Sequence, residues 1–473
     1  MSLHIPLENS YARLPDRFFS RMLPVPVKAP TLLAFNHGLA KELGIKPGPD
    51  DVMAQVFGGN TPPEGAEPLA QVYAGHQFGG FSPQLGDGRA HLLGEIVTPG
   101  GARVDLQLKG SGPTPYSRMG DGRAWLGPVL REYVVSEAMH ALGIPTSRAL
   151  AAVATGESVY RDTGAMPGAV LTRVATSHLR VGTFQYFAAR RDMPGLKALF
   201  DYAAQRHAPE AETPADLLET VIDRQAQLVA QWMSVGFIHG VMNTDNTSIS
   251  GETIDYGPCA FMDGFHPDTV FSSIDAQGRY AFSNQPNVIV WNMAQLATAL
   301  VGLMPNQDAA VSEFTQLVHA MPDRIHAHWL AAYGRKIGIA QATPEDETLI
   351  TDLLQAMAEN DADFTNTFRA LVDGTARDHF TDPAAFDRWA PSWQDRIKSE
   401  AAPFETMRAA NPVYIPRNHQ VEHMIQAAVS GDFRPFDRLM RVLSDPFTRQ
   451  DGADDLTRPP GPSEVVHRTF CGT

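Results

Sequence analysis

Apolar and polar positions alternate along one stretch of this chain as they do in β-strands. Between residues 71 and 110, the apolar run 91–97 and the alternating apolar positions of 104–108 are separated by glycine-rich turns. Such alternation predicts adjacent antiparallel strands joined by hairpins. Two further strands are predicted at 157–161 and 169–174, on either side of a turn at 163–168.

Elsewhere the apolar positions recur with a helical period. Residues 217–233 place leucine, valine, isoleucine and tryptophan on one face and lead into a short polar loop. An amphipathic helix is expected at 31–43, ended by Gly44, and another at 125–142, ended by Gly143. Further helices are predicted at 286–303, 310–335, 346–360 and 420–430.

These elements divide the chain into a mainly β part and a mainly α part. We predict an α+β fold with a mainly β lobe at 1–175, which includes an N-terminal extension, and a mainly α lobe at 176–450. A polar tail at 451–473 carries Cys471.

Composition narrows the classes of function. Of the 473 residues, 43% are hydrophobic and 19% are charged, which is typical of a folded globular protein. The net charge of −15 argues against general binding to nucleic acid or anionic membranes, because both need basic surface. No apolar run approaches the roughly 20 residues of a membrane span, and the N-terminus lacks a signal-peptide pattern. We therefore expect a cytoplasmic protein with no nucleic-acid or membrane partner.

A polar loop after the longest predicted helix carries candidate metal ligands. Asp245, Asn246 and Asp255 bring three oxygen-bearing side chains close together in sequence. Mg²⁺ prefers oxygen ligands, usually one or two carboxylates together with phosphate oxygens. The order of His239, Asn246 and an Asp-Tyr-Gly that begins at Asp255 resembles the catalytic loop and metal-binding motif of protein kinases. The kinase base, however, would fall on Val241, which cannot accept a proton.

Several basic residues could hold phosphate. Lys109 ends a strand pattern and Glu132 lies on the next predicted helix, as in the Lys–Glu pair of kinases. Gly-Asp-Gly-Arg occurs at 86–89 and again at 120–123, and such turns can form anion-binding nests. Arg173 and Arg180 follow the last predicted strand and could bind a triphosphate end. Taken singly, each of these features could also be a surface charge or a plain hairpin turn.

One competing pattern indicates zinc. His419, Glu422 and His423 match the H-x-x-E-H of inverted zinc proteases. No third ligand is evident, and five-residue patterns often arise by chance.

Several long motifs together resemble the selenoprotein O family, also called the YdiU family. They are YAGHQFGGFSPQLGDGRA, LQLKGSGPTPYSRMGDGRAWL, REYVVSEAMHALGIPTSRAL, HGVMNTDN, TIDYGP and NPVYIPRNH. The resemblance runs from about residue 9 to the C-terminus. It implies a protein-kinase-like bilobal fold with a C-terminal helical extension. It also implies that ATP binds flipped relative to kinases, so that AMP passes to Ser, Thr or Tyr hydroxyls of proteins and pyrophosphate leaves.

The resemblance also implies roles for individual residues. Asp245 would be the proton acceptor, and Asn246 and Asp255 would hold Mg²⁺, with Mn²⁺ as the alternative metal. The expected partners are protein substrates with hydroxyl acceptors. The nucleotide contacts that it implies are Gly86, Gly88, Arg89, Lys109, Asp121, Gly122, Glu132, Arg173, Arg180 and Asp255.

The two cysteines allow a redox hypothesis. Cys259 follows the Asp-Tyr-Gly by two residues and Cys471 lies in the tail, so a reversible disulfide would tether the tail across the active-site entrance. The alternative is that Cys259 packs as a small hydrophobic residue, and the cytoplasm keeps most thiols reduced. For the activity, three other hypotheses stay open: uridylyl transfer from UTP with Mn²⁺, a conventional kinase, and a non-catalytic nucleotide-binding redox sensor.

Overall fold

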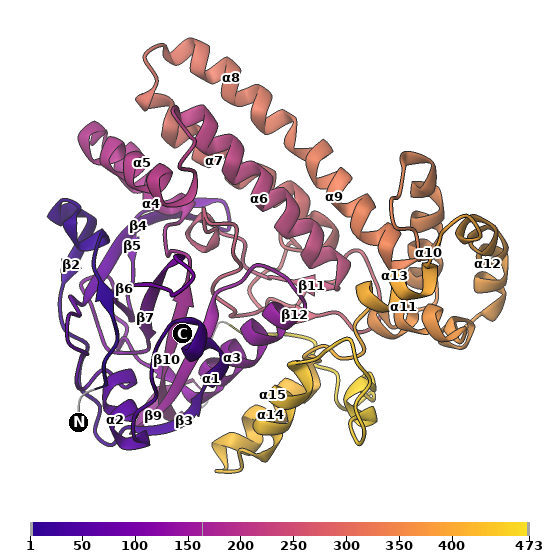
Figure 1. The fold of residues 1–473 in the computed structure, drawn as a ribbon, viewed down its shortest axis with the longest axis horizontal. Coiled ribbons are helices and arrows are strands. Elements are labelled where there is room, and N and C mark those ends of the chain that lie inside the picture. Colours follow the sequence, from indigo (N-terminus) through magenta and orange to yellow (C-terminus); the bar gives the residue numbers. More distant parts are fainter. Residues whose placement is uncertain (1–2, 163, 471–473) are drawn as a thin grey trace.

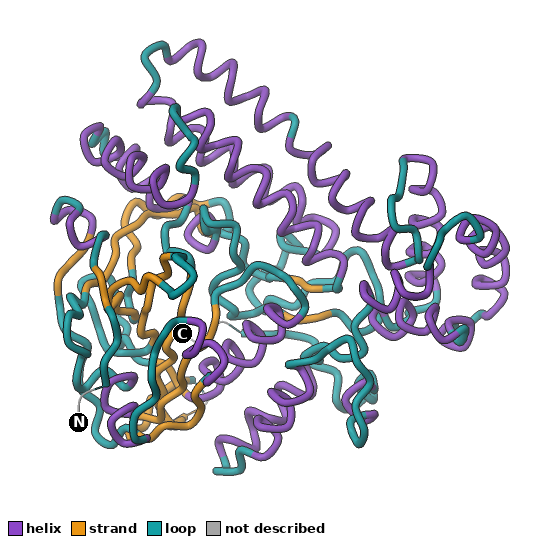
Figure 2. Tube along the Cα trace, viewed as in Figure 1, coloured by secondary structure: helices purple, strands orange, loops and turns teal. Residues whose placement is uncertain are grey.

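The structure is a computed structural model that describes residues 3–162 and 164–470. One antiparallel sheet gathers the strands of the N-terminal part, and helices make up most of the remainder (Figures 1 and 2). The α+β class predicted from the sequence is therefore confirmed.

The sheet has ten strands, and its main path runs β2-β4-β6-β7-β10-β9-β3. β1 pairs with β6, β5 with β4 and β8 with β10. The strands are β1 Leu7–Glu8, β2 Phe19–Arg21, β3 Thr31–Phe35, β4 Leu69–Gln77, β5 Gly80–Gly86, β6 Ala90–Val97, β7 Arg103–Lys109, β8 Ala124–Trp125, β9 Arg148–Arg161 and β10 Gly164–Ala175, with a separate ribbon of β11 Phe237–Ile238 and β12 Ala260–Phe261. The hairpins predicted between residues 71 and 110 are confirmed as β4 to β7.

Residues 31–43 form a strand and a short helix, so the single helix predicted there is wrong. β3 pairs with β9, where Leu32 lies opposite Val153. α1 (His37–Glu42) then begins because the Asn36 side chain accepts a hydrogen bond from the Leu39 N–H at 3.0 Å. Apolar spacing alone did not distinguish an edge strand from a helical turn.

β9 and β10 are longer than predicted. β10 starts at Gly164, so the predicted turn at 163–168 is strand from Gly164 onward, with a register shift between Pro167 and Ala169. Residue 163 lies outside the described residues. Pairing along a long hairpin outweighs the local turn preference of glycine and proline.

The helices cover the sheet and form the rest of the molecule. α6 starts with a capping box in which Asp216 N donates to Thr213 Oγ1 and Thr213 N donates to Asp216 Oδ2. The helix predicted at 310–335 is two helices, α8 and α9, with Pro322 in the first turn of α9. The other helices are α2 Asp50–Phe57, α3 Leu126–Ala141, α4 Val181–Ala189, α5 Met193–His207, α6 Pro214–Ser234, α7 Gln285–Leu300, α8 Gln307–His319, α9 Met321–Lys336, α10 Glu347–Glu359, α11 Phe364–Asp373, α12 Pro383–Ile397, α13 Pro403–Ala410, α14 Asn418–Val429 and α15 Arg434–Leu443.

The sheet is packed on both faces. One face packs on α1 and α2, with Phe57, Leu106 and Leu108 in a common core. The other face meets α3, which also contacts α14 and α15; Leu130 and Phe436 belong to this core. Because α3 is enclosed from both sides, polar residues on it are also buried.

One helical segment, Phe282–Leu303, is long and apolar enough to cross a membrane by length and composition. This differs from the expectation that no run reaches that length. Of its most apolar window, 44% is buried inside the fold, where α7 packs against α4 and α6. Core helices pass the same test, so this observation is weak evidence for a span.

Candidate nucleotide site

Three cations and two carboxylates meet where β7 ends. Lys109 Nζ lies 2.6 Å from Glu132 Oε2 on α3 and 3.2 Å from Asp255 Oδ1. Arg173 Nε, on β10, lies 2.5 Å from Glu132 Oε1, and its Nη2 donates to Asp255 Oδ1. Arg180 Nη1 lies 2.8 Å from Asp255 Oδ2. Five of the residues singled out in the sequence therefore form one network.

Strand register and helix packing build this network. Lys109 lies opposite Leu171 and Gln107 lies opposite Arg173, so the Lys109 and Arg173 side chains project from the same face of the sheet. α3 packs on that face and presents Glu132. Asp255 has a left-handed backbone (φ +61°), an uncommon conformation outside glycine that Asp tolerates better than most residues.

Burial and neighbouring charge shift these groups strongly. Burial opposes ionisation of Asp255, but Arg173, Arg180 and Lys109 outweigh it and hold the pKa of this carboxyl well below its usual range. Burial, together with the nearby Arg173, lowers the pKa of Lys109. The three cations therefore keep Asp255 ionised. Burial and the neighbouring positive charge make the protonated form of Lys109 less favourable.

Asp245 lies next to this network but is bound differently. Its side chain is 6% exposed, Oδ2 accepts a hydrogen bond from Gln77 Nε2 at 3.0 Å, and the buried Oδ1 has no partner among the described residues. Burial raises the pKa of Asp245 to about 6. Arg180 Nη1 donates to the Asp245 carbonyl at 2.6 Å and so links Asp245 to Asp255.

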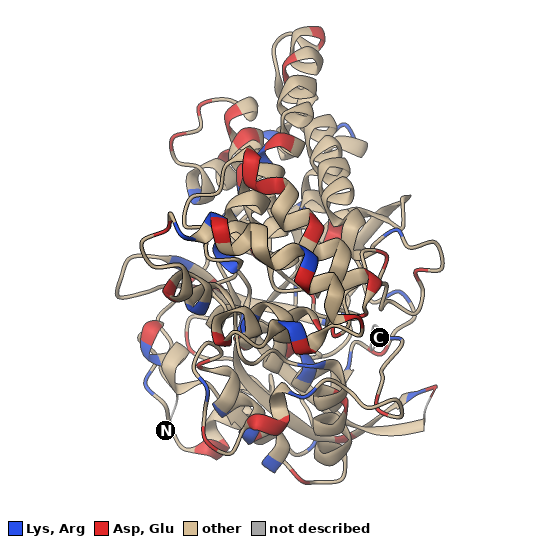
Figure 3. Cartoon of the chain, turned by 90° about the vertical axis from the view of Figure 1, so that its right-hand side faces the viewer, with Lys and Arg blue, Asp and Glu red and all other residues tan. Residues whose placement is uncertain are grey.

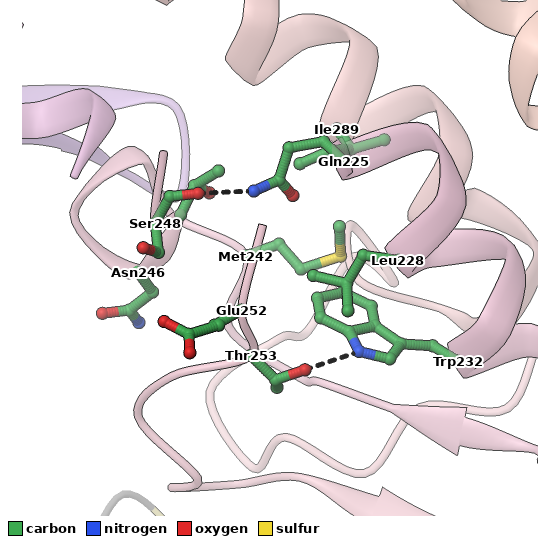
Figure 4. Close-up of a pocket in the computed structure, with 10 residues that line it drawn as sticks. Gln225, Leu228, Trp232, Met242, Asn246, Ser248, Glu252, Thr253 and Ile289 are labelled. Atoms are coloured by element: carbon green, nitrogen blue, oxygen red, sulfur yellow. Dashed lines mark hydrogen bonds between the residues drawn. The ribbon is translucent and has the colours of Figure 1, made fainter. Parts of the chain in front are cut away.

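Asn246 is held by the loop itself and by α6. Its Nδ2 donates to the carbonyl of Val241 at 3.1 Å, so the residue in the kinase-base position serves as a backbone acceptor. Asn246 and Glu252 lie on one side of a 10 Å³ cavity, and Trp232 of α6 lies on the other (Figure 4). That cavity has room for about one water molecule at most. α6 fixes the loop, because Trp232 Nε1 donates to Thr253 Oγ1 at 2.8 Å.

No group of three or more His, Cys, Asp or Glu side chains within residues 3–162 and 164–470 could hold a metal ion. This does not conflict with a nucleotide-bound Mg²⁺, which needs only one or two protein ligands beside phosphate oxygens. Asp255 would supply the carboxylate, and Asn246, whose Nδ2 donates to the Val241 carbonyl, would supply its amide oxygen. The donor set therefore fits Mg²⁺ only in company with phosphate.

The two Gly-Asp-Gly-Arg turns pack against one segment of the chain. A Cβ at Gly88 would stand 2.8 Å from the Tyr116 carbonyl, and a Cβ at Gly122 would stand 2.1 Å from Pro113 N. A Cβ at Gly86 would meet the Tyr116 ring at 2.4 Å. Close backbone approach thus requires these glycines whatever else the turns bind.

The charged residues of these turns are placed differently from the central network. Asp121 pairs at the surface with Arg161, 2.8 Å away, and this partner holds the pKa of Asp121 below its usual range although partial burial opposes it. The carbonyl of Arg89 accepts a hydrogen bond from Gly110 N at 2.7 Å, and its charge contributes to the lowered pKa of Lys109. Contact of Gly86, Gly88, Arg89, Asp121 and Gly122 with a nucleotide stays a prediction.

Comparison with known proteins identifies the family of this chain. The family model described as Protein adenylyltransferase SelO matches residues 2–444. The chain belongs to the SelO family. Family relatives named "Protein nucleotidyltransferase YdiU" include proteins of Ruegeria sp. (strain TM1040), 62% identical, and Roseobacter denitrificans, 63% identical, each over 473 residues and all of both chains. A Jannaschia sp. relative of the same name is 57% identical over 99% of both chains. This SelO-family chain is thus an enzyme of the nucleotidyltransferase type.

Three site residues of this SelO-family chain were missed in the sequence. Asp87 is 3% exposed and lies 3.9 Å from Arg180 Nη2, and the Tyr73 ring lies beneath the Arg180 guanidinium at 4.6 Å. Gln77 binds Asp245. Asp87 and Gln77 stand inside motifs that were used for the resemblance, but nothing local in those motifs shows which member faces the site.

Other candidate features do not join the site. Glu422 lies 3.0 Å from Arg131, so the carboxylate of the H-x-x-E-H pattern forms an ion pair with an arginine. A cavity of 780 Å³ lies between α3 and α15 and is lined by none of the predicted site residues. Acidic and basic positions are interspersed along the elements on the side that Figure 3 presents, without a basic stripe there.

Proposed function

We propose that this enzyme transfers AMP from ATP to Ser, Thr or Tyr hydroxyls of protein substrates and releases pyrophosphate, in a kinase-like bilobal arrangement with the nucleotide flipped. The observation that carries the proposal is the convergence of three buried cations, because Lys109, Arg173 and Arg180 all contact Asp255, Lys109 and Arg173 also contact Glu132, and Asp87 lies 3.9 Å from Arg180. Arginine matches phosphate oxygens in bidentate pairs, and lysine binds them as a point charge. A polyphosphate is an anion that such a cluster fits.

The orientation of the bound phosphate chain is inferred from the residues at the two ends of the cluster. Because Arg180 bridges Asp255 and the Asp245 carbonyl, a phosphate chain held by Arg173 and Arg180 would run toward Asp245. The acceptor hydroxyl oxygen then attacks the α-phosphorus, its proton goes to the Asp245 carboxylate, and pyrophosphate leaves with the electron pair of the broken P–O bond. Arg173 and Arg180 stabilise the charge that develops on pyrophosphate.

Asn246 and Asp255 would hold the Mg²⁺ ion, or Mn²⁺ in its place. When bound, the ion neutralises phosphate charge and lowers the barrier to departure of pyrophosphate. The family description names adenylyl transfer, whereas the relatives are named nucleotidyltransferases, so UTP with Mn²⁺ is the second candidate donor.

The disulfide between Cys259 and Cys471 remains a proposal, since Cys471 lies outside the described residues. It is supported by the placement of Thr469, whose Oγ1 donates to the Pro258 carbonyl at 2.5 Å. Cys259 itself is buried, and burial raises the pKa of its thiol to about 11, so it is a poor nucleophile until that segment opens. Two free thiols counted in the oxidised, unfolded protein would end this idea.

The test compares two variants with α- and γ-labelled ATP. Asp245→Ala and Asp255→Ala should both lose transfer of the α-label by about 10³-fold or more, and only Asp255→Ala should also lose metal-dependent nucleotide binding. A mass gain of about 329 Da on an acceptor protein marks AMP, whereas about 80 Da marks phosphate and would restore the kinase hypothesis. ATP binding without any transfer would favour the redox-sensor hypothesis.

A further inference from the structure

The β4–β5 hairpin is fastened to the loop that carries Asp245. His76 N donates to Thr244 Oγ1 at 2.7 Å, and Phe78 N donates to Asn243 Oδ1 at 3.0 Å. Phe78 has a left-handed backbone (φ +51°), which is uncommon for a bulky residue and is typical of a tip held by its surroundings. These bonds use backbone N–H groups, so they hold the hairpin without help from the side chain between them.

That intervening side chain is Gln77, and it reaches the carboxylate of Asp245. Its Nε2 donates to Oδ2 at 3.0 Å. Oδ1 is enclosed without a hydrogen-bond partner. Gly75 borders it so closely that a Cβ there would stand 2.6 Å from Oδ1.

The two oxygens of Asp245 are therefore unequal. An amide NH₂ group only donates, so Gln77 satisfies Oδ2 and fixes the plane of the carboxylate. Supporting hydrogen bonds of this kind orient catalytic groups before the substrate arrives.

We propose that Gln77 is a positioning residue for Asp245: by holding Oδ2 it fixes the plane of the carboxylate that receives the proton of the acceptor hydroxyl. The inference rests on the proposed function, in which Asp245 is the proton acceptor. Gln77 touches neither substrate nor nucleotide in this scheme and acts through Asp245 alone.

The experiment measures steady-state AMP transfer by full-length wild type, Gln77→Leu and Gln77→Glu, with Gln84→Leu as the matched control. Gln84 is an exposed glutamine on β5 that contacts Arg190 and not Asp245. Both Gln77 variants should lower kcat about 10- to 100-fold, as loss of a supporting hydrogen bond does elsewhere. The KM for ATP and the nucleotide Kd should stay at wild-type values, and Gln84→Leu should be unchanged throughout.

Each other outcome overturns the inference in a recognisable way. If Gln77→Leu is as active as wild type, Gln77 does not position Asp245, and the proposed function stands. If kcat falls together with nucleotide affinity, the role of Gln77 is structural. If wild type transfers no AMP, or Asp245→Asn is fully active, the proposed function fails and this inference falls with it.

Discussion

Two buried ion clusters in this molecule differ in how their charges are arranged. At the candidate site, Lys109, Arg173 and Arg180 converge on Glu132 and Asp255, and a third carboxylate, Asp87, lies 3.9 Å from Arg180. In the second cluster Arg417, 1% exposed at its side chain, binds both Asp263 and Asp363, and its Nη1 lies 2.7 Å from Asp363 Oδ2.

The Arg417 cluster is arranged to hold segments of the fold together. Arg417 joins three separate segments: the chain after β12, the start of α11 and the start of α14. Its two carboxylates are already matched to a single guanidinium in a geometry that also uses Nη2, so the cluster is closed. At the candidate site three cations from three separate elements meet, and the proposed function uses them to bind phosphate.

The largest effect on stability is expected from Arg417→Met. Two carboxylates would be left facing each other in a mostly buried position, and the free energy of unfolding should fall by about 3–5 kcal/mol. Chemical denaturation measures this, with Arg434→Met, which removes an exposed ion pair to Asp432, as the control that should show no measurable change. Equal free energies of unfolding of the two variants would mean that the Arg417 cluster does not stabilise the fold.

Arg180→Met should act on binding more than on stability. The substitution removes one of the three cations of the candidate site, so nucleotide affinity should fall about 10- to 100-fold, or about 1.4–2.8 kcal/mol. Calorimetric titration with ATP and Mg²⁺ measures this. Arg190→Met is the control; Arg190 lies at the other end of α4, donates to carbonyl and amide oxygens and stacks over the Tyr186 ring. Unchanged nucleotide affinity in Arg180→Met would contradict the proposal that the cations of the candidate site bind phosphate.

A buried cation outside both clusters sharpens the comparison, because Lys336 has no carboxylate partner among the described residues. It is 2% exposed, lies 4.3 Å from the centre of the Phe368 ring, and burial lowers its pKa to about 7 from a usual 10.5. Between those values the unfolded chain binds more protons than the folded one, so the free energy of unfolding should rise with pH, by up to about 1.4 kcal/mol per pH unit.

Lys336→Met isolates this contribution. The difference in unfolding free energy between wild type and Lys336→Met should change in favour of wild type from pH 7 to pH 9, and denaturation at each pH measures it. A difference that stays constant with pH would show that the ring of Phe368 keeps Lys336 charged in the folded state.

Part of this architecture could be predicted from the sequence because it depends on local pattern. The hairpins of residues 71–110 and the helices α3 and α6 follow from periods of two and of 3.6 residues, and caps and glycines fix their ends. The same local pattern failed at residues 31–43, where pairing with β9 decided the outcome. It also failed at 310–335, which reads as one apolar period but is two helices.

The sequence by itself determined which residue types were available for chemistry: a lysine at the end of a strand, a helix glutamate, two arginines, and an Asp-Asn pair before an Asp-Tyr-Gly. Only the tertiary structure decided which of them meet. Arg173 lies 82 positions from Asp255, and Gln77 lies 168 positions from Asp245. The reason is that strand register and burial are not encoded in any local pattern. They bring charged residues that are far apart in the sequence into one desolvated network, where each group shifts the pKa of its neighbours.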